Sequence, residues 1–105
     1  MNTDDVLSAA IRDKQCLTGL YDGAVRHFAP HALGATADGT PAVFVFQYAG
    51  ETTSGIPSGG EWRCFHLDRL SHLRLNEHRW RSRSNYSLKR QTCLATVTAG
   101  LPISA

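Results

Sequence analysis

The run Trp62-Arg63-Cys64-Phe65-His66-Leu67-Asp68-Arg69 decides the fold more than any other stretch of this chain. Its residues alternate as in a half-buried β-strand, so that Arg63, Phe65 and Leu67 point to one face. Arg63 therefore shares a face with two apolar side chains, and Arg69 follows just past the end of the strand. A cation held beside a core, at the rim of a sheet or barrel, is suited to binding an anion.

The remainder of the chain predicts one short helix followed by strands. Thr3-Asp4-Asp5 provides an N-cap and an acidic first turn for a helix over about residues 4–14. Asp22-Gly23 and Asp38-Gly39 are turn dipeptides between apolar runs. The predicted strands cover residues 16–21, 24–28, 31–37, 41–48, 62–67, 71–75 and 92–98.

These elements predict a mainly β protein with one N-terminal helix. We expect residues 1–105 to form a single domain, because 105 residues support only one modest core. Tight turns between short strands, over about residues 16–98, favour a small SH3/Sm-like barrel or a strongly bent antiparallel sheet.

Composition and cysteine usage predict an ordinary globular protein of the cytoplasm. The chain is 42% hydrophobic and 19% charged, and no apolar run approaches the roughly 20 residues of a membrane helix. The acidic start lacks the basic, then apolar, pattern of a signal peptide. Three cysteines (Cys16, Cys64 and Cys93) without a CxxC motif predict small apolar side chains kept reduced, not a disulfide framework.

Charge is distributed unevenly along the chain. Residues 1–62 carry three Lys/Arg against seven Asp/Glu, whereas residues 63–105 carry eight against two. The second half therefore has a net charge of +6, which predicts an anionic partner. The alternative is that the fold intermixes the two halves and the charges pair with one another.

Two ordered motifs resemble the WYL domain family. Pro30-His31-Ala32-Leu33-Gly34 is followed about thirty residues later by Trp62-Arg63-x-Phe65-x-Leu67-Asp68-Arg69-Leu70, and the resemblance extends over roughly residues 6–75. The segment from Phe46 to Gly55 is similar to short, stand-alone WYL-like proteins. The resemblance implies an Sm-like barrel and a regulatory role in which a nucleotide-like or nucleic-acid ligand is sensed.

The resemblance and the strand ends together predict a ligand site. Arg63 and Arg69 occupy the family's basic positions, and His31 matches its histidine. The full predicted set is His31, Gln47, Tyr48, Arg63, Phe65 and Arg69. Structural alternatives exist: Arg69 pairs with Asp68 or Glu61 to brace a turn, His31 hydrogen-bonds to a backbone carbonyl, and Tyr48 packs at the rim.

A second candidate interface is the basic segment 78–90. It interleaves five cations with Trp80 and Tyr86, a combination suited to single-stranded nucleic acid because cations contact phosphates and aromatic rings stack on bases. The predicted nucleic-acid-binding residues are Arg79, Arg81, Arg83, Lys89 and Arg90. The alternative is a solvated loop with Trp80 folded back onto the barrel.

Catalytic chemistry is not predicted. The chain has no P-loop, GxSxG or HExxH motif, and its five histidines lack metal-ligand spacing. Cys64 and His66 share a strand face without an apparent third group to orient them. We therefore expect a non-enzymatic module, with no metal or cofactor, that binds a nucleotide or single-stranded nucleic acid. The alternative is a protein-interaction or assembly module that binds a protein partner, or itself as a homo-oligomer, through edge strands.

Overall fold

The computed structural model describes residues 2–50 and 59–101, which begin with one helix. Helix α1 covers Thr3–Asp13, one residue earlier than predicted. The predicted N-cap within Thr3–Asp5 is wrong: the cap is Asn2, because its side-chain oxygen accepts a hydrogen bond from the Asp5 amide (2.8 Å). No helix among these described residues is long and apolar enough to cross a membrane.

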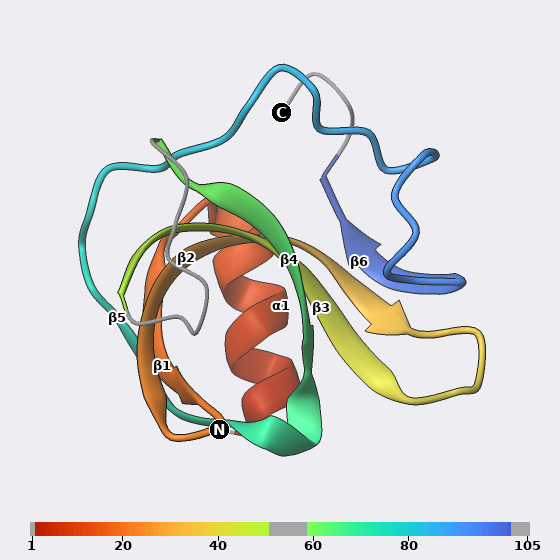
Figure 1. Cartoon of the computed structure of the whole chain (residues 1–105), viewed down its shortest axis with the longest axis horizontal. Helices are drawn as coiled ribbons and strands as arrows, with labels where there is room; N and C mark the ends of the chain where they lie inside the picture. The colour runs from red at the N-terminus through yellow and green to blue at the C-terminus, as the bar shows by residue number, and fades with distance from the viewer. Residues whose placement is uncertain (1, 51–58, 102–105) are drawn as a thin grey trace.

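Six strands in the described part of the chain form one antiparallel sheet (Figure 1). Its order is β4-β3-β2-β1-β5, and β6 pairs with β2. A 3-10 helix, η1, covers Leu67–Arg69 and joins β4 to β5. The strand bounds are β1 Leu17–Tyr21, β2 Ala24–Ala35, β3 Pro41–Gly50, β4 Glu61–His66, β5 Leu70–Leu75 and β6 Thr96–Gly100.

The predicted strongly bent sheet is confirmed, whereas the sheet does not close into a barrel. Within residues 2–50 and 59–101, no ladder joins β4 to β5. The bend nevertheless brings β1 close to β4, since the Tyr21 and Phe65 rings stack with centroids 4.3 Å apart. The Tyr21 hydroxyl also accepts a hydrogen bond from the His66 amide (3.1 Å).

Strand β2 is the longest strand of the bent sheet and pairs with β1, β3 and β6. The sequence predicts two strands, 24–28 and 31–37, interrupted near Pro30, but the structure contains one continuous strand with a register shift between Pro30 and Ala32. Pro30 is tolerated because a bulge leaves its position without a required ladder donor. Strand β3 pairs along one edge of β2, while β1 and β6 share the other.

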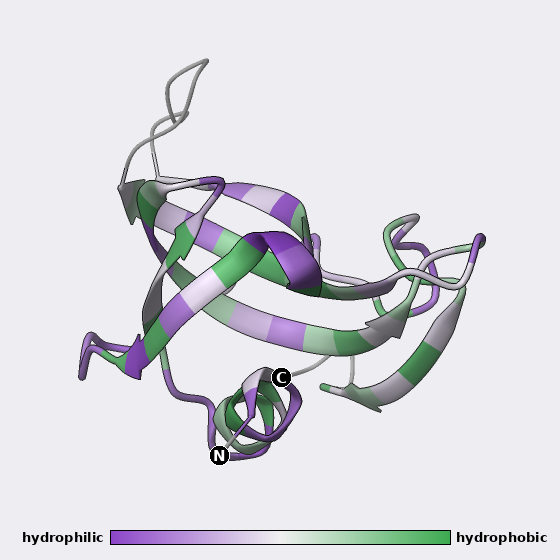
Figure 2. Cartoon of the chain, turned by 90° about the horizontal axis from the view of Figure 1, so that it is seen from below, coloured by the Kyte–Doolittle hydropathy of each residue, from purple (hydrophilic) through white to green (hydrophobic). Residues whose placement is uncertain are grey.

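The core lies between α1 and the inner face of the sheet, by which we mean the face toward the helix. Figure 2 shows α1 nearly end-on beneath the sheet, with apolar and polar positions alternating along the strands. The helix packs on β2, β5 and β6. The buried side chains of this core include Leu7, Ile11, Leu17, Phe28, Leu33, Val43, Val45 and Phe65.

An extended segment, residues 76–95, lies on the opposite, outer face, and we call it the arm. It contains neither helix nor strand and arches from β5 to β6 around the outside of the sheet (Figure 1). The last strand therefore begins at Thr96, not at the predicted position 92. The arm is anchored at its end by the Ala95 amide, which donates to the Ala35 carbonyl oxygen (2.8 Å).

Replacing Gly34 by alanine should destabilise the protein by about 1–3 kcal/mol, because an added Cβ overpacks the contact between β2 and β6. An ideal Cβ on Gly34 would lie 1.8 Å from the backbone oxygen of Thr96, which cannot turn aside. Gly19→Ala is the matched control, since its nearest obstacle is the end of the flexible Leu73 side chain. The prediction is wrong if urea unfolding shows the same loss in the free energy of unfolding for Gly34→Ala and Gly19→Ala.

Candidate ligand-binding cleft

A cleft of about 720 Å³ lies between β4, the β2–β3 turn and the arm. This volume falls within the range of about 300–1,000 Å³ that is typical of small-molecule sites. Apolar rings from β3 and β4 form part of the wall, and polar groups surround them. The lining residues are Thr36, Ala37, Asp38, Phe44, Trp62, Arg63, Cys64, His66, Thr92 and Cys93.

A smaller hollow of about 190 Å³ adjoins this cleft. The two share Phe44, Trp62 and Thr92 in their linings, so they form one groove. The smaller hollow adds polar and cationic residues of the arm, namely Asn85, Ser87, Arg90 and Gln91. The groove therefore combines an aromatic floor with two cations, Arg63 in the cleft and Arg90 in the smaller hollow.

The floor of the groove is a pair of stacked aromatic rings. Phe44 and Trp62 lie nearly parallel, with centroids 4.9 Å apart and an interplanar angle of 10°. The Trp62 indole nitrogen donates to Asn85 Oδ1 of the arm (2.9 Å). Tyr86 lies behind this pair, 5.4 Å from the Trp62 centroid. The packing holds the indole in one orientation, as a preformed binding surface requires.

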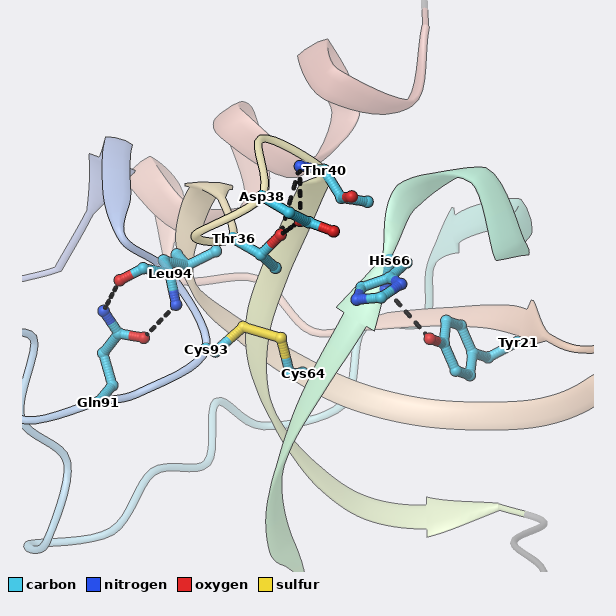
Figure 3. Close-up of a disulfide and its surroundings, with 9 residues drawn as sticks. All are labelled: Tyr21, Thr36, Asp38, Thr40, Cys64, His66, Gln91, Cys93 and Leu94. Carbon is cyan, nitrogen blue, oxygen red and sulfur yellow. Dashed lines mark hydrogen bonds between the residues drawn. A yellow bond between two sulfur atoms is a disulfide. The ribbon is translucent and has the colours of Figure 1, made fainter.

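A disulfide between Cys64 and Cys93 closes one side of the cleft (Figure 3). The prediction of three reduced cysteines is thus wrong for two of them, and only Cys16 is a free, buried thiol as expected. Spacing in the sequence does not reveal the pair, since 29 residues separate its members. With its sulfur bonded to Cys93, Cys64 has no thiol that could act as a nucleophile beside His66.

His31 lies in the interior, beneath the arm, and has no exposed surface. Its Nδ1 donates to the Ala29 carbonyl oxygen (2.8 Å), and its Nε2 accepts from the Ser82 hydroxyl (2.7 Å). Burial lowers the pKa of His31 from 6.5 to about 4, so the ring is neutral near pH 7. This geometry matches the alternative in which the histidine bonds to a backbone carbonyl, and it ties the arm to β2.

Gln47, Arg63 and Phe65 lie on the inner face. Strand alternation predicts the shared face of Arg63 and Phe65 but does not place Gln47 there. Gln47 and Phe65 are buried, and Gln47 accepts a hydrogen bond from Arg26 Nη1 (3.4 Å). Arg63 forms an ion pair with Glu61, which lies opposite Gln47 in the β3–β4 register. Arg63 also contributes to the lining of the cleft, from the edge of the sheet.

Tyr48 lies on the outer face, separated by the sheet from Gln47, its neighbour in the chain. It is 9% exposed, and its hydroxyl is hydrogen-bonded to His78 Nδ1 (2.8 Å) and to Asn76 Nδ2 (3.0 Å). Burial raises the pKa of Tyr48 to about 12. The guanidinium of Arg81 lies over its ring, 4.5 Å from the centroid. Tyr48 thus fastens the beginning of the arm to β3.

Arg69 braces the turn between β1 and β2. Its guanidinium makes a two-pronged contact with Asp22, in which Nε lies 2.7 Å from Oδ1, and it lies 4.9 Å from the Tyr21 centroid. The hydrogen bond from Arg69 holds the pKa of Asp22 below its ordinary value. Arg69 therefore braces a turn through an ion pair, as the structural alternative to ligand binding predicts. Its partner, however, is Asp22 and not Asp68 or Glu61.

The five predicted nucleic-acid-binding cations are all exposed and all belong to the arm: Arg79, Arg81, Arg83, Lys89 and Arg90. Arg83 lies over the Phe46 ring, 5.4 Å from its centroid. Arg90 is the member that reaches the groove. Trp80 is partly buried and packs against the core. This position agrees with the alternative prediction, in which Trp80 folds back onto the sheet.

The structure divides the six predicted ligand-binding residues among three places. On the inner face lie Gln47, Arg63 and Phe65. His31 and Tyr48 attach the arm to the sheet, and Arg69 braces the turn between β1 and β2. Sequence reasoning missed Phe44 and Trp62 as the floor of the groove. The available signal was the strand alternation, which places Trp62 on the face opposite the core.

Within the described residues, no group of three His, Cys, Asp or Glu side chains is arranged to hold a metal ion.

Comparison of the chain with protein-family models, with characterised proteins and with solved structures finds no match.

Proposed function

We propose that this protein is a non-enzymatic binding module whose outer groove takes a nucleotide unit, either free or within a single strand of nucleic acid. The observation that carries the proposal is the continuity of the cleft with the smaller hollow across Phe44 and Trp62, with Arg90 at the far end. A planar base fits an aromatic surface, and a phosphate pairs with a guanidinium.

The surroundings of the groove favour an anionic ligand over a neutral one. Arg90 is exposed and lies in the hollow next to Asn85 and Gln91, whose amides can contact a sugar or base. The other four cations of the arm, Arg79, Arg81, Arg83 and Lys89, are exposed as well. A longer strand would follow them, because cations along the backbone path are what sequence-independent binding uses.

Arg90→Ala should weaken the binding of ATP and of a ten-residue deoxythymidine strand by about tenfold, which corresponds to about 1.4 kcal/mol. Arg90 is a sharper probe than Arg63, whose guanidinium is already held by Glu61. For the strand, the slope of log affinity against log salt should become about 0.7 less steep, since one phosphate contact is lost. Fluorescence anisotropy at two salt concentrations measures both quantities.

Arg12→Ala is the matched control. It removes the same charge from an exposed position on α1, where Arg12 pairs with Asp13. We expect its effect on affinity to stay below twofold. Binding of the strand without binding of ATP would assign the site to nucleic acid. The proposal is wrong if neither probe binds, or if Arg12→Ala and Arg90→Ala weaken binding equally.

A further inference from the structure

The Cys64–Cys93 disulfide joins the edge strand β4 to the arm at the groove itself. Both half-cystines line the cleft, and the arm residue before the second, Thr92, lines both the cleft and the adjoining hollow. The covalent link thus holds one wall of the groove against another.

Other contacts hold the arm on both sides of this link. Before it, the Tyr86 hydroxyl donates to the Leu101 carbonyl oxygen (2.7 Å), and after it Leu94 is buried and Ala95 bonds to Ala35. Lys89 and Arg90, between these anchors, are exposed. Cleavage of the disulfide would therefore remove the covalent tie between this short stretch and β4, while the anchors keep the arm on the sheet.

Both residues of the disulfide have surface exposed to solvent. Cys64 is exposed because it lies on the outer face of an edge strand, and Cys93 is partly exposed. Exchange begins when a thiolate reaches one sulfur of a disulfide, so access decides whether a reductant can act. The remaining cysteine, Cys16, is buried and takes no part.

We propose that the groove is under redox control through this disulfide, an inference that rests on the proposed nucleotide-binding function. A dithiol reductant supplies two electrons and two protons, the S–S bond breaks to give two thiols, and the reductant becomes a disulfide. The part of the arm that lines the groove, Thr92 and Cys93, is then no longer held in its preformed position, so the ligand binds more weakly. Exchange with an oxidised dithiol reverses the reaction and restores the groove.

Limited trypsin digestion tests the release of the arm without any ligand. After reduction with dithiothreitol, we expect cleavage after Lys89 and Arg90 to become at least fivefold faster. Cleavage after Arg26, which is buried, should not change and serves as the internal control for unfolding. Equal rates before and after reduction would overturn the proposal, as would a parallel rise at Arg26, which would mean that reduction unfolds the protein.

Cysteine variants assign the effect to this pair. The double variant Cys64→Ser/Cys93→Ser should be cleaved at the rate of the reduced protein, with or without dithiothreitol. Cys16→Ser keeps the disulfide and should respond to dithiothreitol as the parent does. Loss of the response in Cys16→Ser would contradict the assignment.

Binding of ATP and the deoxythymidine strand then tests control of the groove. We expect both reduction and the double serine variant to weaken binding by about three- to tenfold, through lost preorganisation. Equal affinity in the two states, with the arm released, would overturn redox control while leaving the binding function intact. Failure of the oxidised protein to bind either probe would overturn the binding function, and the trypsin result would still decide whether the disulfide holds the arm.

Discussion

Acidification from pH 7 to pH 4 should lower the free energy of unfolding by about 3 kcal/mol through His31 alone. In the folded protein burial lowers the pKa of His31 from 6.5 to about 4. As the pH falls, the unfolded chain therefore binds this proton before the folded protein does. The stabilisation from His31 is complete above about pH 6.5 and is lost as the pH falls toward 4.

Urea unfolding at several pH values, for the parent and for His31→Gln, isolates this effect. The variant should be less stable at pH 7, because it disturbs the contacts with Ala29 and Ser82, but its stability should change much less between pH 6.5 and 4. Burial also lowers the pKa of His27, and that contribution remains in both proteins. His72→Asn is the control, because it replaces an exposed histidine and leaves the contacts of His31 with Ala29 and Ser82 intact. Parallel pH profiles for the parent and His31→Gln would refute the argument.

Local sequence patterns predicted most of the sheet because local chemistry controls those elements. Asp22 and Gly23 both adopt positive φ, 53° and 80°, as the predicted tight turn between β1 and β2 requires. Pro41 begins β3, at the position where the predicted strand 41–48 begins. The path of β2 through Pro30 was not predictable from local preference, because the register shift there is stabilised by pairing with β3 on one edge and β6 on the other.

The site was harder to predict than the fold because it depends on contacts between distant segments. Strand alternation correctly placed Arg63 and Phe65 on one face, but it also requires Gln47 and Tyr48 to lie on opposite faces, so the two do not share one site. The arm has no periodicity from which its path could be predicted. Its attachment to Tyr48, and the pairing of Cys93, follow only once the sheet exists.

Phe65→Ala should be the most disruptive substitution in the predicted ligand set, with a loss of about 3–5 kcal/mol in the free energy of unfolding. Phe65 is 1% exposed, and its ring stacks on Tyr21 of β1 and meets Phe28 of β2 edge-on, with centroids 5.3 Å apart. It thereby links β4 to the far side of the bent sheet, where no strand pairing between β4 and β5 is present among the described residues. Truncation removes this contact and leaves a cavity that the surrounding rings cannot fill.

A graded series separates this structural role from a role in ligand contact. Phe65→Leu keeps most of the apolar volume and should have a smaller effect than Phe65→Ala. Tyr21→Phe keeps the stacked ring and removes only the acceptor for the His66 amide, so a loss of about 1 kcal/mol is expected. Since Phe65 does not line the groove, Phe65→Leu should bind ATP as the parent does. A large loss of affinity in a folded Phe65→Leu variant would place the ligand at the inner face, beside Gln47 and Arg63, instead of in the outer groove.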